Sequence, residues 1–309
     1  MQHLIFLFIL LPGFLFSQSG EDLFSEANKA RKAKNYSKAF ELYNKAIEKN
    51  PDNRDYYLQR CECLMDMEKY QQAFQCFSDA IIKFPTDPHF YFGRGVLAEA
   101  FDKNQHAIED FTSALQFATE DTFKAIILSN RGGSRAKIRD FTNALNDLKD
   151  AYKINPKSVA ILTNLGYISD EAGKPEDAIG YLEKALELQP DFMPAISNLG
   201  FKYQKLGNHK KAIEYFDRAI KLDPKSGFPW NNRGYSKLLM GDKKGALKDI
   251  NQSIKLNPSN SYAYRNRGLV YVHMNKKDLD FKDFVQALNM VFAAQYGDDV
   301  ILLKNRHCR

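Results

Sequence analysis

The cysteines and histidines are the residues best suited to metal binding or nucleophilic chemistry. Cys61, Cys63 and Cys76 lie close together in the sequence, as the ligands of a metal cluster would. The six histidines are scattered, and no two of them stand at a metal-ligand spacing on one predicted helix. No catalytic triad, phosphate-binding loop or pair of catalytic carboxylates can be identified either. We therefore predict a protein that is not an enzyme and that carries no metal ion or cofactor.

Asparagines and aromatic residues recur at a spacing that suits the binding of a peptide. On a helix their offsets fall on one face. A carboxamide offers both a donor and an acceptor to a peptide backbone, and an aromatic ring offers a large apolar contact at little rotamer cost. We predict that this face binds a peptide. The asparagines are spaced 34 residues apart, at Asn130, Asn164, Asn198, Asn232 and Asn266, and their neighbours on the face are Tyr167, Phe201, Tyr235, Phe228, Tyr262 and Lys205.

Arginine and aspartate form a second recurring set, sixteen residues apart. The pairs are Arg94 with Asp110, Arg131 with Asp147, Arg233 with Asp249, and Arg267 with Asp283. Where Leu165 or Leu199 replaces the arginine, Tyr181 or Tyr215 replaces the aspartate. Charge is thus matched with charge and apolar with apolar. We therefore predict that each pair holds two facing helices together and does not bind a ligand.

The elements that position these residues follow from an internal repeat. An alanine recurs about every 34 residues, from Ala39 to Ala246. A second small residue follows each of these alanines seven positions later, usually with a large apolar residue between the two. This pattern predicts one face of a closely packed helix. Prolines end six of these helices. An upstream helix carries a glycine, called the marker glycine, at Gly95, Gly132, Gly166, Gly200, Gly234 and Gly268. The alanines recur every 34 residues, with one step of 37, at Ala39, Ala73, Ala107, Ala144, Ala178, Ala212 and Ala246.

This pattern resembles the tetratricopeptide repeat. One full instance runs from Trp230 to Gly234 and continues with Ala246, Ser253 and Pro258. The resemblance implies an all-α fold, a right-handed superhelical solenoid of antiparallel helix pairs. The three extra residues of the long step are expected either to lengthen the turn at 120–122 or to extend a helix. We predict a signal peptide at 1–19, eight repeats within 20–292 (20–53, 54–87, 88–124, 125–158, 159–192, 193–226, 227–260 and 261–292) and a capping helix at 293–309.

The resemblance also implies a function. In tetratricopeptide arrays the first helix of each repeat lines the concave surface, which places the predicted peptide-binding face in a groove. It implies a protein-interaction scaffold whose groove binds an extended peptide or a helix of one or more partner proteins. One alternative for the asparagines stays open, namely that they bridge neighbouring first helices and do not bind a peptide. An alternative for the whole chain is that it acts as an assembly factor of an envelope complex and uses its convex and end surfaces. A glycan-binding solenoid is a third class of function.

The N-terminus has the pattern of a secretory signal peptide. An apolar run from Leu4 to Phe16 precedes Ser17 and other small or polar residues, and the run is too short to span a bilayer. We expect export to the periplasm, the envelope or the medium, without a membrane span after cleavage; the alternative is an uncleaved N-terminal anchor. The net charge of +6 arises from 44 basic and 38 acidic residues that are interspersed, so it predicts no nucleic-acid partner.

The repeat gives the cysteines a structural interpretation. Cys61 stands where later repeats carry the marker glycine, which favours a place in the packed core over a metal site. Cys76 lies on the facing predicted helix. After export it can form a disulfide with either Cys61 or Cys63.

Overall fold

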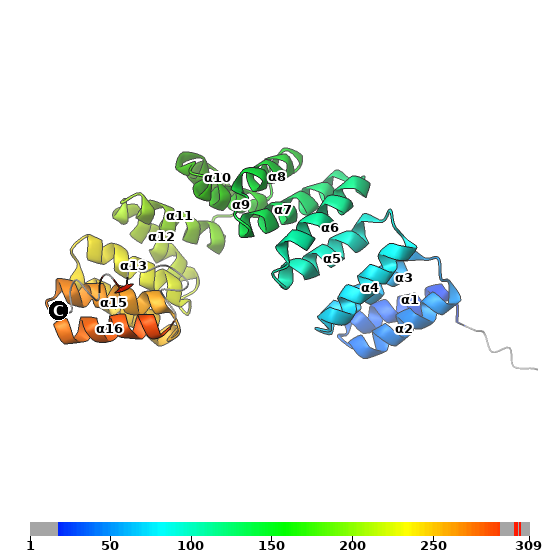
Figure 1. Ribbon diagram of the computed structural model, residues 1–309, viewed down its shortest axis with the longest axis horizontal. Coiled ribbons are helices and arrows are strands. Elements are labelled where there is room, and N and C mark those ends of the chain that lie inside the picture. Colours follow the sequence, from blue (N-terminus) through cyan, green and yellow to red (C-terminus); the bar gives the residue numbers. More distant parts are fainter. Residues whose placement is uncertain (1–17, 291–299, 302, 304–309) are drawn as a thin grey trace, which may run out of the picture. The chain divides into compact units, whose positions relative to one another are not determined.

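The computed structural model describes residues 18–290, 300, 301 and 303 (Figure 1). Within these residues there are sixteen α-helices and no strand, so the predicted all-α fold class is confirmed. Residues 1–17 of the predicted signal peptide and most of the predicted capping helix lie outside the described residues. The helices are α1 (Gly20–Lys32), α2 (Tyr36–Lys49), α3 (Arg54–Asp66), α4 (Tyr70–Lys83), α5 (Pro88–Ala100), α6 (Asn104–Phe117), α7 (Asp121–Lys137), α8 (Phe141–Ile154), α9 (Val159–Glu171), α10 (Pro175–Leu188), α11 (Met193–Lys205), α12 (His209–Leu222), α13 (Gly227–Leu239), α14 (Lys243–Leu256), α15 (Ser261–His273) and α16 (Lys277–Asn289).

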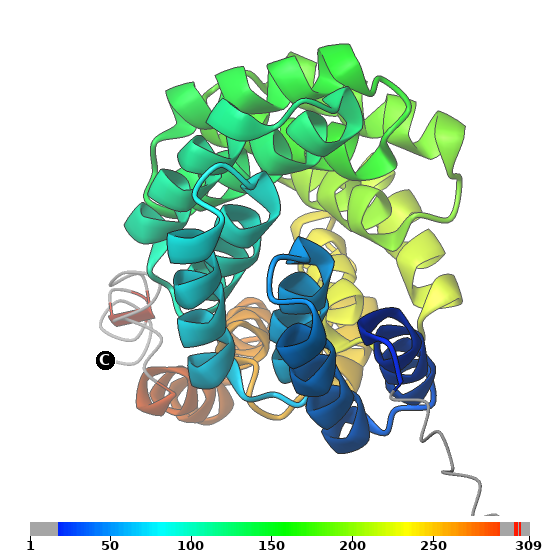
Figure 2. The same cartoon turned by 90° about the vertical axis from the view of Figure 1, so that its right-hand side faces the viewer.

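Consecutive helices form pairs, each joined by a short turn, as both views show (Figure 2). Every turn needs one residue in the left-handed region just after the first helix. Gly173, Gly207 and Gly241 adopt it with φ between 75 and 88°. Glycine is suited to this position because it has no Cβ. In the other five turns a non-glycine residue takes the same conformation, with φ between 56 and 65°.

The chain divides into two compact units, and the boundary lies between Glu120 and Asp121. Unit 1 contains α1 to α6, and unit 2 contains α7 to α16. The three extra residues of the sequence fall at this boundary. They extend α7, which has 17 residues where the other first helices have 13. The fourth additional residue of α7 comes from the preceding turn, which has three residues instead of four. Because α7 begins at Asp121, it crosses the boundary that the sequence predicts between residues 124 and 125.

Within each unit, the core lies between the two helices of each pair and between successive pairs. The repeating alanines are fully buried there. The marker glycines allow the two helices of a pair to approach closely: a Cβ on Gly200 would lie 2.6 Å from the ring of Phe216. At the C-terminal end, Val300 is helical and packs against Phe284 and Ala287. This buried valine belongs to the segment predicted to cap the last repeat.

Each of the four arginine–aspartate pairs joins the first and second helix of its repeat by two parallel hydrogen bonds. In each pair Nε and Nη2 of the arginine donate to the two carboxylate oxygens, and the aspartate is at least 93% buried, with 2–7% exposed. The donor–acceptor distances are 2.9 and 2.7 Å for Arg94 with Asp110, 2.9 and 2.7 Å for Arg131 with Asp147, 2.7 and 2.7 Å for Arg233 with Asp249, and 2.7 and 2.8 Å for Arg267 with Asp283.

The second repeat replaces this pair by a disulfide. Arg60 and Cys76 are sixteen residues apart, so the cysteine stands where other repeats carry aspartate. Cys76 is joined to Cys61, and Cys63 remains a buried thiol. The structure thus selects one of the two pairings that the sequence leaves open. Nε of Arg60 is buried and has no hydrogen-bond partner among the described residues, and burial lowers the pKa of this arginine.

Candidate functional site

The first helices of unit 2 carry the predicted peptide-binding face. These helices, α7, α9, α11, α13 and α15, each contact the next one in the series. Side chains also join them: Nε2 of Gln204 on α11 donates to the backbone oxygen of Asn232 on α13 at 2.7 Å and to Oγ of Ser236 at 2.8 Å. The predicted residues therefore lie on neighbouring helices of one unit.

A cavity of about 690 Å³ opens between α11, α13, α15 and the loop before α15. We call it the α11–α15 cavity. Three of its aromatic residues are partly exposed, with exposed fractions of 59% for Phe228, 48% for Phe201 and 38% for Tyr262. Of the residues predicted from the sequence, the cavity brings together Phe201, Phe228, Asn232, Tyr235, Tyr262 and Asn266.

Three asparagines and one arginine form a chain of hydrogen bonds along the cavity wall. Nη1 of Arg265 donates to Oδ1 of Asn266 at 2.9 Å, and Nδ2 of Asn266 donates to Oδ1 of Asn231 at 3.0 Å. Nδ2 of Asn231 then donates to Oδ1 of Asn232 at 3.1 Å. Asn231 and Asn266 are only 3% and 4% exposed. Their burial is possible because each amide finds a partner.

The five predicted asparagines lie in different surroundings. Asn266 is buried and bridges α15 to α13, so the inter-helix alternative describes this position. Asn130 is half-buried and donates to the backbone oxygen of Ile126 on its own helix, at 2.8 Å. Asn164 is exposed and lines no cavity described here. Asn232 alone combines partial exposure with a place in the α11–α15 cavity.

The remaining predicted residues lie beside the cavity. Asn198 and Tyr167 border a hollow of only about 30 Å³, which they share with Phe201. Nζ of Lys205 bonds to Asp170 at 3.0 Å and lies 5.9 Å from the centre of the Phe201 ring. The buried Lys202 contacts the same carboxylate, and burial followed by repulsion from Lys205 lowers the pKa of Lys202.

Sequence reasoning missed more than half of the residues that line the cavity. Asn231 and Arg265 each precede a predicted asparagine by one position, which on a helix is about 100° away from the predicted face. Asn257, Ser259 and Asn260 follow the end of α14, and such short polar side chains are typical of a loop. This run is a further signal by which the loop beside the cavity could have been found. The missed residues are Gln204, Asn231, Asn257, Ser259, Asn260, Ser261, Arg265 and Met290.

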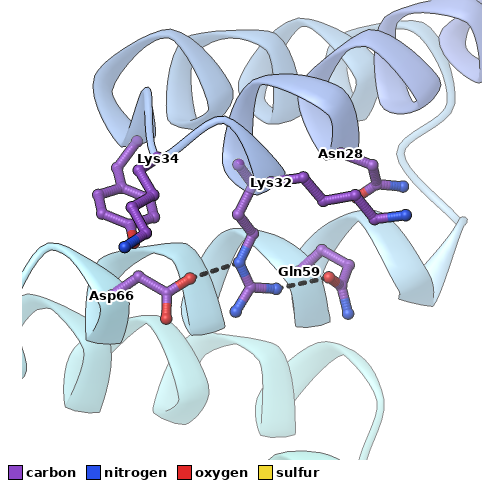
Figure 3. A pocket seen from close by; sticks show the side chains of 7 residues that line it. Asn28, Lys32, Lys34, Gln59 and Asp66 are labelled. Atoms are coloured by element: carbon purple, nitrogen blue, oxygen red, sulfur yellow. Dashed lines mark hydrogen bonds and ion pairs between the residues drawn. The ribbon is translucent and has the colours of Figure 1, made fainter.

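Unit 1 has polar networks of a different kind. A cavity of about 520 Å³ between α1 and α3 is bordered by Asn28, Lys32, Lys34 and other residues (Figure 3). Arg31 crosses it and donates to Gln59 at 2.6 Å, to Glu62 at 2.8 Å and to Asp66 at 2.5 Å. The guanidinium of Arg31 therefore joins α1 to α3.

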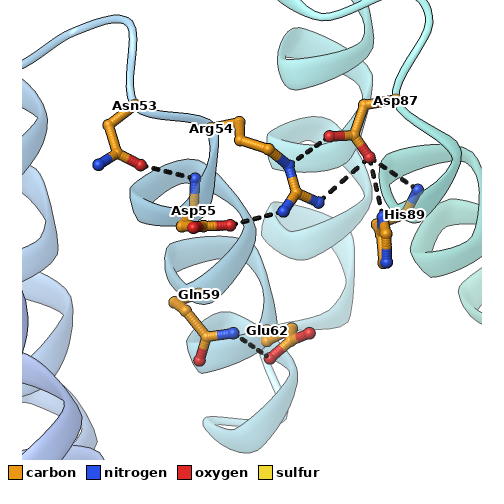
Figure 4. A network of polar contacts seen from close by, with 7 residues as sticks. All are labelled: Asn53, Arg54, Asp55, Gln59, Glu62, Asp87 and His89. Carbon is orange, nitrogen blue, oxygen red and sulfur yellow. Dashed lines mark hydrogen bonds and ion pairs between the residues drawn. The ribbon is translucent and has the colours of Figure 1, made fainter.

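A second network joins α3 to the start of α5 (Figure 4). Arg54 donates to Asp87 through Nη2 at 3.2 Å and through Nε, and the backbone amide and Nδ1 of His89 contact the same carboxylate at 2.9 and 3.0 Å. Burial raises the pKa of Asp87, but the hydrogen bonds from His89 and Arg54 outweigh it and lower this pKa to about 2. These contacts link two neighbouring repeats.

Two features are absent from the described residues. No cluster of three or more histidine, cysteine or acidic side chains is placed to hold a metal ion there. Nor does any helix in the described part of the chain have the length and apolar character needed to cross a membrane.

Comparison with solved structures finds the same fold in several proteins. A chain of the APC/C hetero-tetramer Cut9–Hcn1 superposes with a TM-score of 0.68 at 17% identity; the match covers 97% of this chain but 57% of that one. A tetratricopeptide repeat protein from Parabacteroides merdae gives 0.60 at 20% identity, covering 94% and 100% of the two chains. PilF of Pseudomonas aeruginosa gives 0.58 at 21% identity, covering 68% and 94%. At these identities the likeness concerns the fold alone.

Comparison with family models identifies the repeats themselves, whereas comparison with curated protein sequences gives no match. Four models described as tetratricopeptide repeat match residues 30–91 and 139–199, residues 62–122, residues 194–226 and residues 229–260. Together they account for 30–122, 139–226 and 229–260, which is more than half of the sequence. The chain therefore belongs to the tetratricopeptide repeat family.

Proposed function

We propose that the chain is a non-enzymatic scaffold that binds an extended peptide or a helix of a partner protein in the α11–α15 cavity. One observation carries this proposal: exposed aromatic rings and hydrogen-bonding amides from three neighbouring first helices converge on one cavity. Proteins built from tetratricopeptide repeats generally act as scaffolds, which supports the same function.

The size and lining of the cavity suit a few residues of a peptide. A volume of about 690 Å³ lies within the range of roughly 300–1,000 Å³ that is typical of ligand sites. Phe228 and Phe201 are about half exposed, so covering the exposed half of each ring is favourable by roughly 1–1.5 kcal/mol. Aromatic side chains of this kind often supply most of the affinity at an interface.

Affinity capture from the exported protein fraction tests this function. The chain is used as bait alongside a variant with Phe228→Ala and Tyr262→Ala, and the bound proteins are identified by crosslinking and mass spectrometry. We expect the double substitution to reduce recovery of the partner by at least about tenfold, because it removes two exposed rings from the cavity.

A matched control separates the cavity from other surfaces. Leu188→Ala truncates a side chain that is 45% exposed on the second helix α10. This variant is expected to capture the partner as well as the unchanged chain. A complex that ignores the cavity substitutions and is lost on Leu188→Ala would contradict the proposal, and it would favour an assembly factor that uses its outer surface.

We also propose that the chain is exported. The Cys61–Cys76 disulfide supports this, because stable disulfides are typical of oxidising compartments outside the cytosol. Intact-mass measurement of the protein from its native source tests the idea. The expected species lacks the leader and has the mass of the oxidised form. A species that retains residues 1–19 and has two free thiols at Cys61 and Cys76 would overturn it.

A further inference from the structure

We propose that Cys61 and Cys76 form a redox-active site: a dithiol reduces the bond between them, and Arg60 then holds Cys76 as a thiolate. The site lies in the second repeat, on α3 and α4 of unit 1, and it includes no residue of the α11–α15 cavity. The thiolate stands where other repeats carry a buried aspartate.

The two cysteines occupy positions that face each other across a helix pair. In the third repeat, a Cβ added to the marker glycine Gly95 would lie 3.2 Å from Cβ of Asp110. Cys61 stands at the glycine position of the second repeat, and Cys76 stands at the aspartate position, sixteen residues after Arg60. The Cα atoms of the cysteines are 5.5 Å apart, which is typical of a disulfide. The bond therefore uses two positions that bring glycine and aspartate together elsewhere.

Arg60 makes one contact of its counterparts but lacks the other. Its Nη1 donates to Oδ1 of Asn44, sixteen residues earlier, at 3.3 Å. Arg94 of the third repeat makes the equivalent contact with Ser78 at 3.3 Å, and its Nε donates to Asp110. Nε of Arg60 is buried and has no hydrogen-bond partner among the described residues. A donor that binds a carboxylate in other repeats is thus left unsatisfied, because a disulfide sulfur carries no charge.

Reduction supplies the missing anion. A neighbouring arginine stabilises a thiolate, which is the charged form of cysteine. Cys76 is only 6% exposed, so solvent and salt screen this attraction little. A sulfur atom lies closer to the backbone than a carboxylate oxygen does, but hydrogen bonds to sulfur are longer, and the two differences partly offset each other. The pair of Arg60 and Cys76 is therefore the thiolate equivalent of the arginine–aspartate pairs.

The neighbouring charges leave this pairing to Arg60. Burial lowers the pKa of Arg60, although the charges of Tyr57 on α3 and Asp79 on α4 act in the opposite direction. On α2 the arginine meets an uncharged asparagine. The guanidinium of Arg94 on α5 is already paired within its own repeat. The register of the repeats thus assigns Arg60 to the charge on Cys76.

Cys63 does not share this position. It lies two residues from Cys61 on α3, so its side chain belongs to the other side of the helix and packs in the core of the first repeat. Its Sγ donates to the backbone oxygen of Tyr36 at 3.4 Å, and burial raises the pKa of its thiol. Cys63 therefore remains a protonated thiol beside the site.

The exchange is a two-electron reduction. A thiolate of the dithiol attacks Sγ of Cys76, which is more exposed than Cys61, and the bond between the cysteines breaks. Cys61 leaves with the electron pair and takes up a proton. The second thiol of the reductant then attacks its own sulfur atom that is joined to Cys76. This step releases Cys76 as a thiolate and oxidises the dithiol to a disulfide, and Arg60 favours it by stabilising the leaving group.

A redox equilibrium at two pH values tests the proposal. The full chain carries Cys63→Ala and Cys308→Ala, and it is equilibrated with reduced and oxidised dithiothreitol; alkylation and mass spectrometry give the reduced fraction. An ordinary thiol is mainly protonated at pH 8, whereas a thiol beside a guanidinium is mainly ionised. At pH 8, Arg60→Leu should therefore shift the equilibrium toward the disulfide by about tenfold, which corresponds to about 30 mV. At pH 6 the thiols are protonated with or without the arginine, so the shift should nearly disappear.

Titration of a single thiol measures the pairing directly. Cys61→Gly is added, which installs the glycine of later repeats and leaves Cys76 as the only cysteine; ultraviolet absorbance then reports its thiolate. The thiolate should form at a lower pH with Arg60 present than in Arg60→Leu, and Arg60→Lys, which keeps the charge, should lie between them. Lys69→Leu removes an exposed cation at the start of the same helix α4, and it should leave the titration unchanged. Far-ultraviolet circular dichroism reports the fold of each variant.

Four outcomes would overturn the proposal. Folded protein whose disulfide resists dithiothreitol has no exchangeable bond. Equal equilibria for the unchanged residue and Arg60→Leu at pH 8 would show that the arginine stabilises no thiolate. A shift of the same size at pH 6 and pH 8 would arise from packing and not from charge. If Arg60→Leu does not fold, the chain that retains Arg60 decides: a Cys76 thiolate that forms only above about pH 8.5, as in an ordinary thiol, would contradict the pairing.

Discussion

Replacing Arg94 by leucine would leave the carboxylate of Asp110 without its only hydrogen-bond partner among the described residues. The carboxylate is 7% exposed and receives two hydrogen bonds of 2.7 and 2.9 Å from the arginine. Removing one partner of a fully buried ion pair costs about 3–5 kcal/mol. The side chain of Arg94 is 25% exposed, so water can reach part of this pair. We therefore expect Arg94→Leu to lower the free energy of unfolding by about 2–4 kcal/mol.

A second substitution at the partner position should recover most of this loss. The fifth repeat has Leu165 and Tyr181 at the same two positions, and both contribute to one apolar cluster. Adding Asp110→Tyr to Arg94→Leu removes the unpaired carboxylate and recreates that apolar contact. The expected coupling between the two substitutions is about 2 kcal/mol, toward the upper part of the range for residues in direct contact.

Urea denaturation followed by circular dichroism measures these effects in the four proteins of the cycle, namely the unchanged chain, both single variants and the double variant. The transition midpoint should fall in each single variant and rise again in the double variant, with the slope of the transition unchanged. If the two losses simply add in the double variant, the residues do not act as a pair. The interpretation of all four arginine–aspartate pairs would then be wrong.

Three further predictions concern the packing and charge of the repeats. Gly200→Ala should lower the free energy of unfolding by about 1–3 kcal/mol, because the added Cβ would overlap a packed ring. Gly180→Ala should raise the free energy of unfolding by about 0.5–1 kcal/mol, because nothing lies within 4 Å of the added carbon. Thermal unfolding that shifts both variants in the same direction would refute this. Cys61→Gly with Cys76→Asp, which installs the glycine and aspartate of other repeats, should be more stable than the same two positions changed to alanine; equal urea midpoints would show that the second repeat gains no charge pair. Asp87→Asn should lower the free energy of unfolding by up to about 2 kcal/mol at neutral pH. The difference from the unchanged chain should disappear as the pH falls from about 4 through about 2, because the carboxylate becomes protonated below its lowered pKa and no longer stabilises the fold. An equal loss of stability at pH 7 and pH 2 would show that the ionised carboxylate is not the cause.

The periodic features of the fold could be predicted from the sequence because the repeats act as an internal alignment. The fully buried alanines and the marker glycines recur at fixed offsets, and each offset reflects one contact between paired helices. The arginine–aspartate pairs could be found in the same way, since their residues vary together from repeat to repeat. A contact that occurs once in each repeat leaves such a pattern.

Features that occur once in the chain could not be predicted in this way. The α11–α15 cavity depends on the single pair Asn231 and Asn266 and on the loop that contains Asn260, and among the described residues no other repeat shows the Asn231–Asn266 contact. The pairing of Cys61 with Cys76 required the distance between two facing helices, which sequence spacing alone did not fix. The extension of α7 was one of two ways to accommodate three extra residues.

Photo-crosslinking at Phe228 tests most directly whether the cavity of unit 2 is the binding surface. A benzoylphenylalanine replaces either Phe228, which is 59% exposed in the cavity, or Leu222, which is 41% exposed at the end of the second helix α12. After irradiation in the native exported fraction, partner peptides should be attached at the cavity position and absent from the control position. Crosslinks that are equally frequent at both positions, or that form only at the control position, would contradict the account.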